Sequence, residues 1–158
     1  MANTSYLRKD VEPYLLRWTA RQIGVHLAEK KIIVGRNSEG RPIPYKFDGV
    51  SDDGTVGVCI SASMAYKTGQ MRKFFLEATL LNRVRKFKRR IMVFIEEDIW
   101  EGFLNQCDGL VDLKNIQPLI CTRLPAKMRR QIKRIYHEAA REAGARRPPG
   151  IKVPGKRR

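Results

Sequence analysis

The chain has few acidic residues for its size and few residues of the kinds that bind zinc. Sixteen Asp and Glu stand against thirty-two Lys and Arg in 158 residues, which leaves a formal net charge of +16. Two histidines, and three cysteines without a Cys-x-x-Cys pair, provide no His/Cys zinc motif. The wide spacing of Cys59, Cys107 and Cys121 predicts no disulfide framework. We expect all three to be small buried residues of a cytoplasmic protein.

Long apolar runs are also missing. No run approaches the roughly 20 residues that cross a bilayer, and the first fourteen residues lack the apolar segment of a signal peptide. The sequence therefore predicts no membrane-spanning segment. The positive charge favours a polyanionic partner, which we expect to be nucleic acid, and DNA rather than RNA. The alternative is that the charge serves only general solubility. A membrane surface fits less well, because the basic helix near the C-terminus has no opposite face rich in Trp or Phe.

Apolar periodicity predicts one α/β domain over residues 1–145, followed by a disordered basic tail at 146–158. Asp10 and Asp98 are the expected helix caps, and residues 37–44, with Gly and two prolines, are expected to form a loop. Four helices are predicted: residues 10–23, a helix from about residue 69, residues 98–110 and residues 125–144. Five strands are predicted: residues 25–35, 44–51, 55–63, 89–98 and 116–124.

The stretch YKFDGVSDDGTVGVCIS, Tyr45–Ser61, carries the clearest local signal. Two runs that can pair flank an Asp-Gly turn, which predicts a β-hairpin. Asp48 lies on the first run, and the second run has no charge after the turn. Further on, the five apolar residues Ile91–Ile95 predict a strand that is covered on both faces.

This order of a helix, a three-stranded meander, a helix and a strand resembles the core of the restriction-endonuclease-like fold, the PD-(D/E)XK superfamily. In prokaryotic members the meander often reads FDxVSEDG and leads into a strand that ends in Glu-x-Lys; KFDGVSDDGTVG, residues 46–57, is similar to it. The resemblance covers roughly residues 10–105. It implies an α/β fold with a mixed sheet, an αβββαβ core and flanking helices, to which a basic C-terminal helix and tail are added.

The resemblance also implies a site, which this sequence matches only in part. In the superfamily the two acids of the meander bind Mg²⁺, and the Lys stabilises charge on the reacting phosphate. Asp48 matches the first acid, whereas the second acid and the Lys fall at Val58 and Ile60. The other face of that strand, within Gly57–Ser61, has no carboxylate or amine either, and a thiol such as Cys59 is a poor Mg²⁺ ligand. Burial against Val58 and Ile60 would raise the pKa of Asp48.

Three functions follow from these observations. The first is a nucleic-acid-binding protein on a nuclease-like fold, without catalytic residues or a cofactor. The second is an active Mg²⁺-dependent DNA endonuclease, because some members of the superfamily take the second acid or the Lys from the following helix. The catalytic residues would then be Asp48, Glu77 and Lys67, with Asp48 and Glu77 as the metal ligands. In the alternative, Glu77 is a solvent-exposed helix residue and Lys67 a cation in a loop. The third is a basic structural or assembly module. Homodimers are frequent in this fold, and no residue here demonstrates one.

Two segments hold most of the positive charge. RVRKFKRR, Arg83–Arg90, has six basic residues in eight, and Arg123–Arg158 has thirteen basic and two acidic residues, a local net charge of +11. Phosphate contacts give affinity rather than sequence specificity, so we expect non-specific or structure-specific binding. The expected contacts are Lys67, Arg83, Arg85, Lys86, Lys88, Arg89, Lys127, Arg130, Lys133, Arg134 and Arg141.

Overall fold

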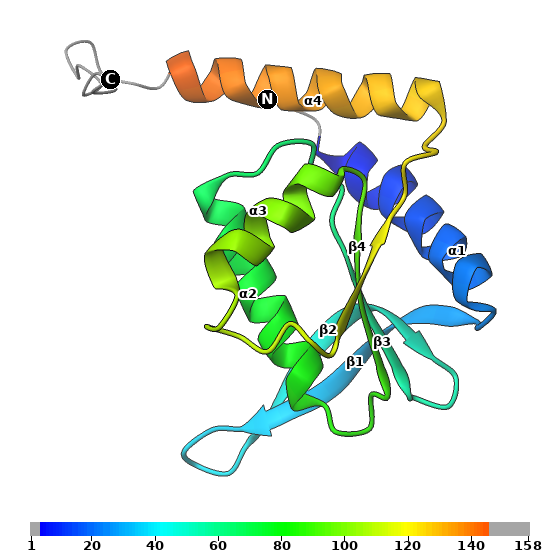
Figure 1. Ribbon diagram of the computed structural model, residues 1–158, viewed down its shortest axis with the longest axis vertical. Coiled ribbons are helices and arrows are strands. Elements are labelled where there is room, and N and C mark those ends of the chain that lie inside the picture. The colour runs from blue at the N-terminus through cyan, green and yellow to red at the C-terminus, as the bar shows by residue number, and fades with distance from the viewer. Residues whose placement is uncertain (1–3, 146–158) are drawn as a thin grey trace.

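The computed structural model describes residues 4–145, which form a five-stranded mixed sheet and four α-helices (Figure 1). The strands are β1 (Leu27–Arg36), β2 (Pro42–Ser51), β3 (Val56–Ile60), β4 (Arg89–Phe94) and β5 (Ile116–Ile120). The helices are α1 (Glu12–Ile23), α2 (Thr68–Arg83), α3 (Glu97–Cys107) and α4 (Ala126–Ala145), and a π-helical turn, η1 (Leu7–Val11), leads directly into α1. The expected α/β class is therefore confirmed.

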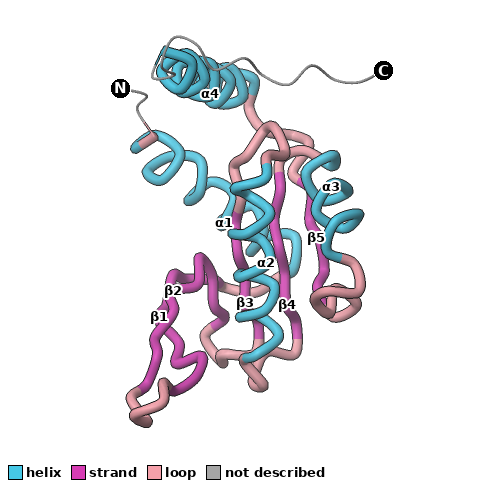
Figure 2. The backbone as a smooth tube through the Cα atoms, turned by 90° about the vertical axis from the view of Figure 1, so that its left-hand side faces the viewer, coloured by secondary structure: helices cyan, strands magenta, loops and turns pink. Residues whose placement is uncertain are grey.

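The sheet is half antiparallel and half parallel, in the order β1-β2-β3-β4-β5. β1, β2 and β3 are antiparallel neighbours, whereas β3, β4 and β5 run parallel. Parallel neighbours need a crossover, which α2 and α3 provide, and both helices cover the same face of the sheet (Figures 1 and 2). The helices α1 and α4 lie on the other side.

Two apolar clusters fill the spaces between the sheet and its helices. Met92 and Phe94 of β4 pack toward α2 and α3, while Ile91, Val93 and Ile95 pack toward α1 and α4. β4 is therefore covered on both faces, as its apolar run predicted. Cys59, Cys107 and Cys121 are free and buried, which confirms their expected role as buried residues without a disulfide.

The aromatic residue inside the basic segment belongs to the core. Phe87 is 1% exposed and packs edge-on against Phe47, with ring centroids 5.2 Å apart. Gly57 of β3 lies directly beneath the Phe87 ring, so a Cβ atom at that position would overlap the ring. Phe87 is thus unavailable for stacking on a nucleic-acid base, and it anchors the basic segment to the sheet.

The β1–β2 hairpin extends away from the rest of the sheet (Figure 2). β2 pairs with β3 only at Gly49↔Val58 and Val50↔Gly57, whereas β1 and β2 stay paired out to Arg36↔Pro42. The outer part of the hairpin therefore has no third strand. One side of it packs on α2, where Arg83 Nε donates to the Val34 carbonyl at 2.9 Å.

Several element ends differ from the sequence-based expectations. Asp10 lies inside the π-helical turn and makes no cap, and α3 begins after Glu96 rather than at a capping Asp98. β2 starts at Pro42, inside the segment 37–44 that was predicted to be a loop. This outer part of β2 pairs only with β1, so it is an edge strand. An edge strand tolerates proline because its outward N–H groups need no partner in the sheet. The predicted tail at 146–158 lies outside the described residues. Within residues 4–145, no helix has the length and apolar content needed to span a membrane.

The contact between Gly57 and Phe87 makes a testable prediction about the core. Gly57→Ala should destabilise the fold by about 1–3 kcal/mol, because the new methyl group has to displace a fully enclosed ring. Urea unfolding measures this loss. Gly69→Ala is the matched control, since nothing lies within 4 Å of its Cβ position on α2, and it should leave stability unchanged or slightly raised. Equal stability of the two variants would show that Phe87 is not held in place.

Candidate functional site

Asp48 lies where β2 separates from β3, at an irregularity in the β1–β2 pairing. Ala28 pairs with Val50 and Lys30 with Phe47, so β2 has one more residue than β1 over this interval. The extra residue is a β-bulge, which bends the strand and redirects its side chains. As a result Phe47 and Val50 both face the α2–α3 core although they are three positions apart.

The carboxylate of Asp48 replaces the missing strand partner of β3. Its Oδ2 atom accepts the N–H of Ile60 at 2.7 Å, whereas the N–H of Ser61 donates to the Val93 carbonyl of β4 at 2.9 Å. The N–H groups of β3 thus alternate between its two sides, and at Ile60 a side chain takes the place of a β2 carbonyl. Asp48 is therefore held at a fixed position in the gap between the strands.

Three side chains from three elements converge at this gap. One potential ligand atom each from Asp48 of β2, Cys59 of β3 and Glu77 of α2 lie within 4.8 Å of one another. The side chain of Glu77 is only 4% exposed, and its Oε1 lies 3.7 Å from the ammonium of Lys73, one helical turn earlier. Asp48 is half-buried. The cluster thus combines two carboxylates, a thiol and one cation.

The structure brings together two of the three residues expected for a relocated active site. Asp48 and Glu77 meet, but Lys67 is an exposed residue at the N-cap of α2, ten residues and about 15 Å of helix before Glu77. The amine beside the carboxylates belongs instead to Lys73. The spacing of Lys73 and Glu77, four residues apart on one helical face, is the sequence signal that would have found it.

The two strand positions compared with the superfamily motif carry apolar side chains on the α1 side of the sheet. Val58 and Ile60 pack in the cluster on the α1 side of the sheet, with Ile60 reaching the edge of a pocket beside Asp48. Cys59 is the residue that lies beside Asp48 and Glu77. A thiol is therefore the side chain of β3 that joins the two acids, while the backbone N–H of Ile60 binds Asp48.

Burial and crowding of like charges raise the pKa values of the carboxyl groups. Burial raises the pKa of Asp48, as expected from the sequence, although the Ile60 N–H and Lys73 oppose it. Burial raises the pKa of Glu77 to about 7, with Lys73 again opposing. For Lys73, burial alone would lower the pKa, but Glu77 and Asp48 outweigh it and hold the pKa above its usual value. Lys73 is therefore a permanent cation at neutral pH.

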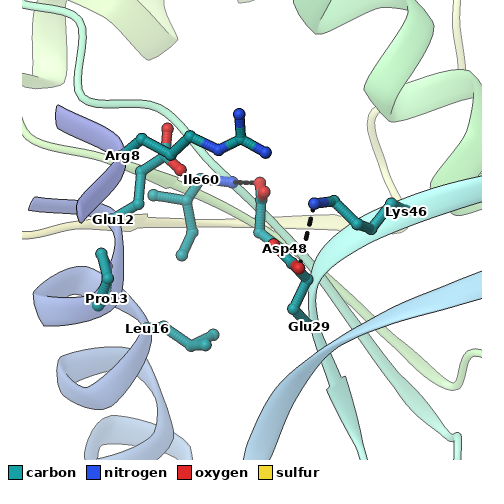
Figure 3. Close-up of a pocket in the computed structure, with 8 residues that line it drawn as sticks. All are labelled: Arg8, Glu12, Pro13, Leu16, Glu29, Lys46, Asp48 and Ile60. Carbon is teal, nitrogen blue, oxygen red and sulfur yellow. Dashed lines mark hydrogen bonds and ion pairs between the residues drawn. The ribbon is translucent and has the colours of Figure 1, made fainter. Parts of the chain in front are cut away.

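An open pocket of about 260 Å³ leads to Asp48 from the α1 side of the sheet. Arg8, Glu12, Pro13 and Leu16 form one wall, and Glu29 and Lys46 of the hairpin form the other. Figure 3 shows the Arg8 guanidinium and the Lys46 ammonium extending toward the Asp48 carboxylate from opposite walls. Lys46 also pairs with Glu29 at 3.1 Å. The pocket thus places cations on both sides of the half-buried acid.

Within the described residues, the two basic segments lie at opposite ends of the molecule (Figure 1). The helix α4 crosses one end beside the start of α1, and the connection from α2 to β4 lies at the other end (Figure 1). Part of the segment Arg83–Arg90 is structural: Arg90 Nε donates to the Leu81 carbonyl at 2.9 Å, and Arg89 donates to Gln117 at 3.1 Å. The side chains exposed in the two segments and expected to contact phosphate are Arg83, Arg85, Lys86, Lys88, Arg89, Lys127, Arg130, Lys133, Arg134 and Arg141.

Comparison with known proteins gives no relative: no family model, curated protein or solved structure matches the chain. Functional inference therefore starts from the geometry of Asp48, Cys59, Glu77 and Lys73.

The buried Glu77 carboxyl predicts an unusual pH dependence of stability. Its pKa is about 7 in the folded chain and 4.5 in the reference state, so the folded state binds the proton more tightly. This contribution to stability is present below about pH 4.5 and is lost as the pH rises through 7, by up to about 3 kcal/mol. Glu77→Gln removes the titration, so the variant should gain stability over the wild type between pH 5 and pH 8.

Urea unfolding of both proteins at the two pH values tests this dependence. Glu97→Gln, an exposed change on α3, is the control and should change the difference by less than about 0.5 kcal/mol. A constant difference between the wild type and Glu77→Gln at both pH values would contradict the raised pKa of Glu77.

Proposed function

We propose that this protein is a divalent-metal-dependent nuclease, whose metal-binding acids are Asp48 and Glu77 and whose cationic side chain is Lys73. The observation that carries the proposal is the convergence of Asp48 and Glu77 from two separate elements. Carboxylates of this kind are the usual ligands of Mg²⁺, which binds through one or two of them and keeps its remaining positions for water and substrate phosphate.

The two acids fit a divalent cation in chemistry and in charge. Asp48 uses Oδ2 to accept one N–H, and a carboxylate has about four acceptor positions, so capacity remains for a metal. Glu77 is enclosed, and its ion pair with Lys73 is longer than a hydrogen bond. A bound divalent metal supplies an activated water and neutralises charge on the phosphoryl group.

The surrounding cations have roles that do not depend on proton transfer. Lys73 stays protonated near neutral pH, so it can stabilise negative charge on a phosphate but cannot serve as a base. Arg8 and Lys46 flank the pocket in front of Asp48, where they would hold a nucleic-acid backbone across it. We infer that the substrate phosphate enters between these two walls.

The restriction-endonuclease-like core is part of this proposal. The succession of α1, the antiparallel meander β1-β2-β3, the crossover helix α2 and the parallel strand β4 agrees with the αβββαβ order. The FDGVSDDG sequence then forms the second strand and the turn of the meander, with Asp48 at its bulge. In this reading the acid and the amine missing from β3 are replaced from α2 by Glu77 and Lys73.

A second function, nucleic-acid binding without catalysis, is favoured by a different observation. Cys59 lies where a second acid on β3 would meet Asp48, and the next residue of that face, Ser61, has no amine. If α2 does not compensate, the basic surface would still bind phosphate. The nuclease and this alternative predict the same affinity for DNA but different products.

A cleavage assay separates the two functions. The wild type is incubated with supercoiled or single-stranded DNA in the presence of Mg²⁺ or Mn²⁺, and we expect it to cut the DNA. Asp48→Asn and Glu77→Gln should each lower the cleavage rate by about 100-fold or more. Asp48→Asn is chosen because its amide oxygen can still accept the Ile60 N–H. Glu97→Gln is the control and should cut normally. A gel shift without cleavage by the wild type would leave only the binding function.

A second prediction concerns the binding surface. Replacing Lys127, Arg130, Lys133 and Arg134 of α4 by Gln should weaken DNA binding and reduce the slope of log K against log salt by about 0.9 for each lost phosphate contact. Gel shifts between about 50 and 200 mM salt measure both quantities. The same change at Arg85, Lys86 and Lys88 shows whether the opposite end also binds. Affinity that does not vary with salt would contradict an electrostatic interface.

A further inference from the structure

Asp48 and Glu77 form a close pair of carboxyl groups at the gap between β2 and β3. The ammonium of Lys73 acts on both carboxyl groups, and Lys46 acts on Asp48 from the pocket wall. Glu12 adds a third carboxyl group close enough to interact with Asp48. Because Glu77 is 4% exposed, water compensates little of its charge. A divalent cation between Asp48 and Glu77 would offset the repulsion between these two carboxyl groups.

Cys59 is the third potential ligand of the cluster, and its thiol limits which metal ions the cluster can bind well. Cys59 is 2% exposed, and its Sγ atom lies within 4.8 Å of ligand atoms of both Asp48 and Glu77. Thiolates favour Zn²⁺ and similar ions and are poor partners for Mg²⁺. Burial and the two acids hold the pKa of Cys59 well above its usual value, but a coordinating metal deprotonates a thiol outright.

We propose that Cys59 is a metal ligand which, with Asp48 and Glu77, forms a three-ligand site for a thiophilic divalent ion such as Zn²⁺, in preference to Mg²⁺. Three protein ligands leave a fourth position for water or a phosphate oxygen. Donors bound to one zinc ion at about 2.0–2.3 Å lie about 3.5 Å apart, so the three side chains have to close by about 1 Å.

The structure provides a route into this site and a way to make room there. Asp48 is half-buried and lines the open pocket, so an ion can reach it from solvent. The side chain of Lys73 is 55% exposed, and its ammonium can leave Glu77 for water when the ion arrives. The proposal rests on the carboxylates of the proposed nuclease site; the thiol is the additional element.

Cobalt titration tests the ligand directly, because a thiolate bound to Co²⁺ gives sulfur-to-metal charge-transfer absorption in the near ultraviolet. The wild type should develop this absorption up to one equivalent of Co²⁺. The double variant Cys107→Ser and Cys121→Ser, which retains Cys59 alone, should behave in the same way. Cys59→Ser should lose the absorption and bind Zn²⁺ at least about tenfold more weakly in a competition assay.

Cys59→Ala is a second variant, because a small apolar side chain fits the buried position even if the hydroxyl group of serine does not. Thermal unfolding checks that both variants fold. Absorption that persists in the Cys59 variants, or none in the wild type at one equivalent, would overturn the assignment. An affinity for Zn²⁺ that is unchanged in Cys59→Ser, with DNA cleavage retained, would also overturn it and leave the nuclease intact. Cobalt absorption in a protein that never cuts DNA would support the ligand set and remove the nuclease.

Discussion

The hydrogen bond from the Ile60 N–H to the Asp48 carboxylate is the interaction on which the site depends. The β2–β3 ladder ends after two pairs, and the next inward N–H of β3 would be buried without an acceptor. Such a group costs about 1–3 kcal/mol when it is unpaired. Because Asp48 satisfies it, the two strands can separate without that cost. The pocket beside Asp48 and the projecting hairpin both follow from this separation.

The sequence predicted the architecture well because the architecture depends on local patterns. The alternation within Ile91–Ile95 determines which residues face each layer, and the Asp-Gly turn determines the β2–β3 hairpin. The bulge at Asp48 has no such pattern. The resemblance to the superfamily motif assigned the second acid and the Lys to Val58 and Ile60, and it offered Glu77 of the following helix as the alternative acid. In the structure Glu77 does lie beside Asp48, and Cys59 joins them.

Long-range contacts explain the remaining differences. Phe87 and Arg90 belong to a run that looks like a charged surface, but Phe87 packs against Phe47 and Arg90 binds the end of α2. Lys73 was overlooked because it acquires its role only from a carboxylate one turn away that proves to be buried. Composition gives the amount of charge correctly, and only the tertiary structure shows how much of it supports the fold.

The ion pair of Lys73 with Glu77 gives the buried carboxyl group a countercharge from the same helix. A cluster of carboxylates with no counter-ion of its own would need a metal before its elements could pack. Here the countercharge is part of the chain, so the packed state of β2, β3 and α2 does not depend on supply of an ion. If the proposed metal ion binds, it replaces one cation by another in a fold that is already packed.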